Sequence, residues 1–137
     1  MSSRIGTLCR RACAWGTGLL LAACASGPTP ESTTWIIGLE AMGLAPDANV
    51  ESIPNFRIDG YKVIDDLHVV LYTGRKQQHV VTLRDNCRGL ETAQRLGHTS
   101  SGGALTRFDK LIVVEFQSSE PCPIAMIQTL KVLPVPR

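Results

Sequence analysis

The sequence lacks any apolar run long enough to cross a membrane as a helix. Its longest such run, residues 12–23, has 12 residues, whereas roughly 30 Å of hydrocarbon needs about 20. Aromatic residues are scarce at 5%, and charged residues make up 19% against 44% hydrophobic residues. This balance excludes a disordered acidic chain and a fibrous repeat. With 137 residues, the chain has the length of one ordinary domain and is too short for two full-sized ones.

Motifs that carry catalysis are also missing. The chain has no Gly-x-Ser-x-Gly elbow for a nucleophilic serine, and Gly102-Gly103 lacks the strand, helix and lysine of a phosphate-binding loop. Asp65 and Asp66 are adjacent, so in a strand they would point to opposite faces rather than form an acid–base pair. We therefore expect a protein that is not an enzyme, with no catalytic residue and no cofactor.

The N-terminal segment has the layout of a secretory signal. Arg4, Arg10 and Arg11 precede the apolar run, and no acidic residue occurs before Glu31. A positive region holds the amino end on the cytoplasmic side while a short apolar stretch inserts, and small residues follow where a peptidase can cut. The pattern predicts export of the chain.

The end of this segment, Leu21-Ala22-Ala23-Cys24, resembles the lipobox of bacterial lipoprotein signal peptides. The resemblance implies that residues 1–23 are removed and that the Cys24 sulfur receives a diacylglycerol. Because Ala25 stands where an aspartate would resemble an inner-membrane retention signal, it further implies an anchor on the periplasmic face of the outer membrane. An ordinary signal peptide with a chance cysteine, or a cytosolic protein with an apolar start, is the alternative.

Removal of the leader would change the charge balance. The whole chain carries a formal net charge of +2, and loss of the three leader arginines leaves 11 basic and 12 acidic residues. A nucleic-acid-binding protein needs a basic face that displaces counterions from phosphates. The mature composition offers none, so we expect no nucleic-acid partner.

Two cysteines remain in the expected mature chain. Cys9 and Cys13 leave with the leader and Cys24 is acylated, so Cys87 and Cys122 are left. In an oxidising compartment an even remainder predicts a disulfide. A reactive thiol or a redox pair is the alternative, but no Cys-x-x-Cys is present and prolines flank Cys122.

The chain divides into three parts by composition. Residues 1–23 are the signal peptide, residues 24–52 hold the lipidated cysteine, a flexible tether and a possible short helix, and residues 53–137 form a small β-rich domain. Residues 25–34 have no large apolar side chain and predict the tether. In the following segment, residues 35–44, apolar residues recur near helical spacing, although Gly38 and Gly43 weaken a helix.

Short strands are expected from residue 53 onward, and the run at residues 67–73 is rich in β-branched and aromatic residues. They are residues 56–58, 61–64, 67–73, 78–84, 93–99, 111–116 and 124–133, of which the last also fits a helical spacing. These runs predict a mainly β fold, a small antiparallel barrel or sandwich with one short helical turn, with an α+β fold as the alternative.

Two aspartates are expected to organise local structure. Asp85 would cap the helical turn, at residues 87–92, because its carboxylate can accept from free backbone N–H groups. Asp109 would hold a backbone turn through its carboxylate, with the neighbouring Phe108 ring buried.

His68 and His79 lie in the two arms of a predicted hairpin. A two-residue connection would place both imidazoles on one face of the sheet, close enough to share a metal ion. A zinc site needs a third and a fourth ligand, and none of Asp65, Asp66 or His98 can be assigned to that place. We therefore predict no metal site and keep His68 and His79 as weak candidates.

Residues 50–133 resemble a family of small exported proteobacterial proteins that is known only as a domain of unknown function. The resemblance rests on residues 53–58, 79–84, 86–90 and 107–109, and above all on the two cysteines, with Gly-Leu after Cys87 and Ile after Cys122. Residues 35–44 lie outside it. Many members have lipoprotein leaders, and the family implies no catalytic residue.

These observations together predict a non-enzymatic accessory protein of the cell envelope. It would be anchored by lipid and would contact another envelope protein or an envelope polymer through a sheet edge or loops. A module that binds a small ligand or a metal through the His68 and His79 face is the alternative.

Overall fold

The computed structural model describes residues 31–74, 76–100 and 102–135. The predicted lipidation site, Cys24, and most of the predicted tether lie outside the described residues. The elements in chain order are α1 (Glu31–Ala41), β1 (Leu44–Val50), β2 (Ser52–Ile53), β3 (Gly60–Val63), β4 (His68–Tyr72), β5 (Gln78–Leu83), β6 (Arg95–His98), β7 (Leu105–Thr106), β8 (Lys110–Glu115) and β9 (Ser118–Val132).

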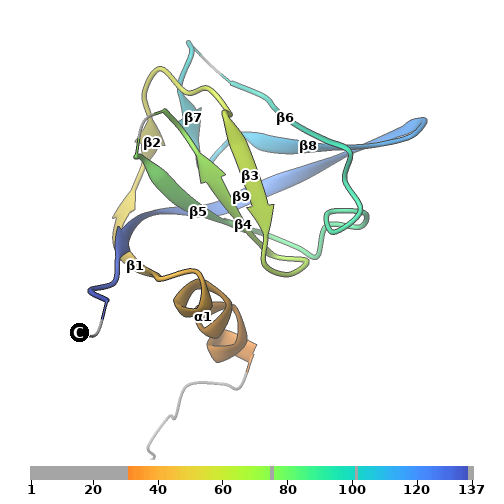
Figure 1. Ribbon diagram of the computed structural model, residues 1–137. Coiled ribbons are helices and arrows are strands. Elements are labelled where there is room, and N and C mark those ends of the chain that lie inside the picture. Colours follow the sequence, from red (N-terminus) through yellow and green to blue (C-terminus); the bar gives the residue numbers. More distant parts are fainter. Residues whose placement is uncertain (1–30, 75, 101, 136–137) are drawn as a thin grey trace, which may run out of the picture.

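The strands form a nearly closed antiparallel barrel-like sheet, so the predicted mainly β fold is confirmed. The strand order is β3-β4-β5-β9-β8-β6, and β1 pairs with the end of β9. β2 and β7 form a separate two-stranded sheet. Figure 1 shows α1 against the outside of the barrel and the β8–β9 hairpin extending away from it.

The long strand β9 connects the two halves of the barrel. Its first part, to Pro123, pairs with β8, and its pairing with β5 begins at Ile124. Pro121 and Pro123 therefore lie inside the strand, before it gains its second neighbour, where a missing N–H costs no ladder hydrogen bond on that side. The preferred strand interpretation of residues 124–133 is correct, but the strand begins six residues earlier than expected.

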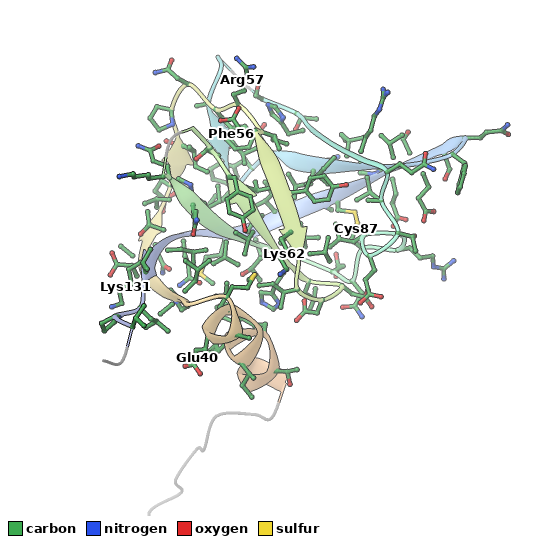
Figure 2. The ribbon with its side chains drawn as sticks, in the orientation of Figure 1. Glu40, Phe56, Arg57, Lys62, Cys87 and Lys131 are labelled. Atoms are coloured by element: carbon green, nitrogen blue, oxygen red, sulfur yellow. A yellow bond between two sulfur atoms is a disulfide. The ribbon has the colours of Figure 1, made fainter. Side chains whose placement is uncertain are left out.

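The barrel interior is filled by apolar side chains from nearly every strand. They include Val69, Leu71, Val81, Leu83, Leu111, Val113, Ile124 and Ile127, each at most 2% exposed. Burial of such side chains stabilises a fold by about 1.5–3 kcal/mol each relative to exposure. The ring of Phe56 joins this cluster from the loop after β2 (Figure 2).

Helix α1 packs on the outer face of the sheet. Leu39 is fully buried there with Leu44 and Val70. A Cβ atom on Gly38 would lie 2.8 Å from Cγ2 of Ile64, so the helix can approach this closely only because residue 38 is glycine. No helix in the described part of the chain is long and apolar enough to span a membrane.

Four local expectations are corrected by the structure. Residues 44–50, placed ahead of the β-rich domain, form β1 within the main sheet. The helix spans residues 31–41 rather than 35–44, and residues 56–58 are not a strand. The segment expected as a helical turn, residues 87–92, forms hydrogen-bonded turns, from Leu90 N–H to Cys87 O and from Thr92 N–H to Gly89 O.

Candidate functional sites

His79 is buried at one end of the barrel. It lies on β5, opposite Leu71 on the interior face of the sheet, and only 7% of its surface is exposed. Its Nδ1 lies 3.2 Å from the hydroxyl oxygen of Thr73, which is also buried. Burial disfavours the charged imidazolium and lowers the pKa of His79 below its ordinary value. The ring is therefore a neutral group that can donate one hydrogen bond and accept another.

Two hollows flank this pair. One, of about 560 Å³, is lined by Ile53, Pro54, Asn55, Arg57, Asp59, Thr73, Gly74 and Gln77. The other, of about 380 Å³, is lined by Val50, Ser52, Ile53, Pro54, Lys76, Gln77, Gln78, His79, Thr129 and Leu130. They share Ile53, Pro54 and Gln77. Their walls offer amide, hydroxyl and charged groups, which suit a small polar molecule.

His68 lies in a different environment, under α1. Its Nδ1 is 2.8 Å from Oδ1 of Asp65, and the same carboxylate oxygen accepts the backbone N–H groups of Leu67 and His68. The ring stacks on Trp35 of α1, with centroids 4.5 Å apart and planes 7° apart. His68 is thus held on one side by a carboxylate and covered on the other by the helix.

The two histidines do not share a face. The connection between β4 and β5 is five residues long rather than two, and the register pairs His68 with Thr82 and His79 with Leu71. Because side chains alternate along a strand, His68 faces α1 while His79 faces the barrel interior. The expectation that both rings lie on one face is therefore wrong, and the two weak candidates cannot share a metal ion. His98 is also elsewhere, with its ring edge-on to Phe56 at 4.6 Å.

Asp109 forms the local structure expected of it, but Phe108 does not. The Asp109 carboxylate accepts hydrogen bonds from the N–H and the hydroxyl of Thr106, at 2.8 and 2.7 Å, and so closes the turn before β8. The Phe108 ring is 78% exposed, with the Arg107 guanidinium 4.9 Å from its centroid. The predicted burial of this ring is wrong, because the turn directs it outward.

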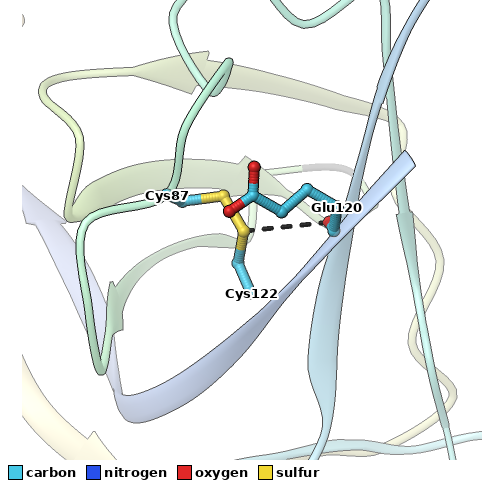
Figure 3. Close-up of side chains that lie close together, drawn as sticks. All are labelled: Cys87, Glu120 and Cys122. Carbon is cyan, nitrogen blue, oxygen red and sulfur yellow. Dashed lines mark hydrogen bonds between the residues drawn. A yellow bond between two sulfur atoms is a disulfide. The ribbon is translucent and has the colours of Figure 1, made fainter. Parts of the chain in front are cut away.

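Cys87 and Cys122 are joined by a disulfide, with their Cα atoms 5.8 Å apart. The bond links the turn after β5 to the first third of β9, and both cysteines are buried. Glu120 projects toward it, and one of its carboxylate oxygens lies within 4.8 Å of both sulfur atoms (Figure 3). While the sulfurs are bonded to each other they are not thiolate ligands, so this trio is a disulfide with an adjacent carboxylate rather than a metal centre.

The surroundings of the disulfide are rich in oxygen. The Cys122 sulfur lies 3.8 Å from the backbone oxygen of Glu120, and the Cys87 sulfur lies 4.0 Å from that of Arg88. A disulfide sulfur carries no hydrogen, so both are sulfur–oxygen contacts rather than hydrogen bonds. An open hollow of about 610 Å³ beside them is lined by Asp66, Asn86, Cys87, Arg88, Gly89 and Glu120.

Sequence reasoning found the cysteine pair but missed Glu120 and the contact of Trp35 with His68. Glu120 is two residues before Cys122, and in a strand such residues lie on the same face, so its position carried a signal. The stacking of Trp35 depends on how a helix docks onto a sheet, which local sequence does not specify.

A comparison with family models places the chain in a family. A model described as a family of unknown function (DUF6491) matches residues 7–133. No curated protein and no solved structure matches the chain. The match extends through residues 35–44, which the expected resemblance left out. Since it covers nearly the whole chain, the protein belongs to this family of unknown function, DUF6491.

Proposed function

We propose that the protein is a lipid-anchored accessory protein of the cell envelope, held by acylated Cys24 on the periplasmic face of the outer membrane. The observation that carries the proposal is the buried Cys87–Cys122 disulfide, because such bonds persist in oxidising compartments outside the cytosol. The lipobox resemblance at residues 21–24 supports the same compartment and supplies the anchor. Two or more acyl chains hold a protein firmly in a bilayer.

The position of α1 suits such an anchor. The helix begins at Glu31, seven residues after Cys24, and seven extended residues reach at most about 25 Å. Because α1 is packed on the sheet through Leu39, the barrel would stay close to the membrane surface. A partner in the same membrane, or a polymer beside it, would lie within reach.

The anchor is tested by metabolic labelling with radioactive palmitate. We expect the wild-type protein to incorporate label, to lose residues 1–23 and to sediment with outer-membrane vesicles. Cys24→Ser should remain unlabelled and keep its leader, while Cys13→Ser, which changes another cysteine of the same segment, should behave like the wild type. Recovery of the wild-type chain at full length, soluble and without lipid, would contradict the proposal.

For the accessory role we propose that a partner binds at a free sheet edge, without chemical turnover. β3 and β6 end the strand order, and strand edges present backbone groups to which an extended segment can pair. At one point the opening between them is bridged by the Tyr61 hydroxyl, which donates to the Ala93 carbonyl at 2.9 Å. Lys62 is the exposed residue of β3 and is marked in Figure 2, while the other three residues of the strand are partly buried.

The partner is sought with a photocrosslinking amino acid at position 62 in intact cells. We expect a discrete adduct that can be identified by mass spectrometry. The matched control places the same amino acid at position 40, an exposed site on α1 (Figure 2). Equal adducts from both positions, or none from position 62, would count against an edge-binding partner.

A second candidate, a small-ligand or metal-binding module, is favoured by the neutral His79, which lines one hollow, and by its contact Thr73, which lines the other. Its test is metal analysis of the purified protein, together with His68→Ala and His79→Ala. Stoichiometric metal that is lost in one variant alone would support a module built on that histidine, because the two rings lie on opposite faces. Metal retained in both variants, or absent from the wild type, would speak against it.

A further inference from the structure

We propose that Glu120 is an electrostatic guard of the Cys87–Cys122 disulfide and slows its attack by anionic thiols. This inference does not depend on lipid anchoring or on a partner, since it concerns the chemistry of the bond in any solution that contains thiols. It rests on the placement of the carboxylate, within 4.8 Å of both sulfurs, and on the open hollow that Cys87 and Glu120 both line.

The hollow sets the direction from which a reagent can arrive. Cys87 lines it and Cys122 does not, although both residues are buried by their exposed fraction. A thiolate that enters there reaches Cys87 before Cys122. Glu120 lines the same hollow, so its charge lies beside the path of the incoming reagent.

The reaction being slowed is thiol–disulfide exchange. A thiolate RS⁻ attacks the Cys87 sulfur, the bond between the two cysteines breaks, and Cys122 leaves as a thiolate. A second RS⁻ then attacks the mixed disulfide, which frees the Cys87 thiolate and forms RSSR. The two electrons that reduce the cystine come from the two reagent thiolates. Negative charge accumulates near both sulfurs in each step, so a neighbouring carboxylate disfavours both the approach and the product thiolates.

The hollow beside the disulfide is lined by more negative than positive side chains. Glu120 and Asp66 are the acidic residues that line the hollow and Arg88 is its cation. The backbone oxygens of Glu120 and Arg88, at 3.8 and 4.0 Å from the sulfurs, add negative ends of dipoles. The local field is therefore negative, and removal of Glu120 or of Arg88 should change the reaction rate in opposite directions.

The test compares reduction of the folded, disulfide-bonded protein with that of Glu120→Gln, which keeps the shape and removes the charge. Three reductants are used: glutathione, which is anionic; cysteamine, whose thiolate carries an ammonium group; and an uncharged trialkyl phosphine. With glutathione we expect Glu120→Gln to react about three- to tenfold faster, the size that one like charge about 5 Å away produces in the largely aqueous surroundings of an open hollow. With cysteamine the gain should be smaller, and with the phosphine the two proteins should react alike.

Two further variants sharpen the comparison. Glu91→Gln removes an exposed carboxylate four residues after Cys87 that is outside the trio, and it should leave all three rates unchanged. Arg88→Gln should slow the reduction of the disulfide by glutathione by a similar factor. Salt at about 1 M, where charges are screened beyond about 3 Å, should remove most of the difference between the wild type and Glu120→Gln.

Rates are followed by alkylation of the freed thiols and mass spectrometry, at several reductant concentrations so that direct attack is separated from reduction after unfolding. A rate proportional to reductant and raised selectively for glutathione in Glu120→Gln supports the guard. Equal acceleration by all three reductants would show that the substitution merely loosens the site, and unchanged rates would show that the charge is irrelevant. Either result overturns the proposal.

Discussion

At the scale of single residues, the buried His79 makes stability depend on pH. Its pKa in the folded protein is lowered by burial, whereas in the unfolded chain it returns to about 6.5. Protons therefore bind the unfolded chain more tightly, so the contribution of neutral His79 is complete above about pH 6.5 and is lost as the pH falls below it. The loss can reach at most about 1.4 kcal/mol per pH unit for one proton.

The corresponding measurement is urea unfolding of the wild type and of His79→Gln between pH 8 and pH 5. We expect the stability of the wild type, relative to the variant, to decrease as the solution is acidified. The other two histidines are present in both proteins, so their contributions cancel in the difference. Parallel stability curves would show that His79 does not titrate differently in the folded and unfolded states.

Asp109 gives a second residue-scale prediction, in a lower pH range. Burial on its own would raise the pKa of this carboxyl, but hydrogen bonds from the Thr106 hydroxyl and N–H and from the Thr99 hydroxyl, together with the charge of His98, lower it below its ordinary value. The stabilisation is therefore complete above about pH 4 and is lost as the pH falls through the lowered pKa.

We expect Asp109→Ala to unfold with a free energy lower by about 1–3 kcal/mol at pH 7, because the hydrogen-bond donors of Thr106 lose their acceptor. The difference between the wild type and the variant, measured by denaturant titration, should shrink as the pH falls below about 4. Asp47→Ala, at an exposed position with an ion pair on the surface, should cost less than about 1 kcal/mol. A constant difference at all pH values would contradict the role of the ionised carboxylate.

At the scale of helices and strands, local sequence predicts most strands of the main sheet. β4, β5, β6 and β8 lie within two residues of where alternation and turn residues place them. β1 escapes prediction because Pro46, Asp47 and Asn49 disfavour strands. It forms because it is added to the edge of β9, where its register shifts between Pro46 and Asn49. Such pairing is a tertiary effect that overrides the local preference of these residues against strands.

The candidate sites are predictable only in part, for a related reason. The cysteine pair follows from counting, but the faces of His68 and His79 depend on the length of one connection. An error of one residue in register moves a side chain to the other face. Both imidazoles can be read from the sequence. The five-residue connection between β4 and β5 sets the register that places them on opposite faces of the sheet.

Helix α1 provides the element-scale prediction. Gly38→Ala would raise helix propensity by about 1 kcal/mol, but the added Cβ would lie 2.8 Å from the Ile64 side chain, so the docked helix must shift. In a chain that starts at residue 25, Trp35 is the only tryptophan. Its stacking on His68 makes its fluorescence a probe of docking.

We expect the emission of Gly38→Ala to shift to the red as Trp35 becomes hydrated, and the shift to be smaller in the double variant with Ile64→Ala, which removes the atom that the new Cβ meets. Ala41→Ser, at an exposed position on the same helix, should leave the emission unchanged. An unchanged spectrum in Gly38→Ala would show that the interface adapts without loss of the stacking contact.

At the scale of the whole molecule, the disulfide restrains a chain with a small core. Cys87 and Cys122 are 35 residues apart, and closing a loop of that size stabilises the folded state by about 3–4 kcal/mol in the chain-entropy model. Domains of this size are typically stable by about 5–15 kcal/mol in total, so the bond contributes a large share. We expect the double variant Cys87→Ala and Cys122→Ala to lose about that amount of unfolding free energy in denaturant unfolding, with the midpoint lowered. Circular dichroism should show that the barrel still forms.

Mass spectrometry without reductant should find the wild type two daltons lighter than its reduced form, which ties the stability difference to the bond itself. The wild type reduced and kept reduced should then match the double variant, because both lack the same constraint. If the reduced protein instead kept its full stability, the fold would rest on the packing of the strands alone, and the bond would serve another purpose than holding the turn after β5 to β9.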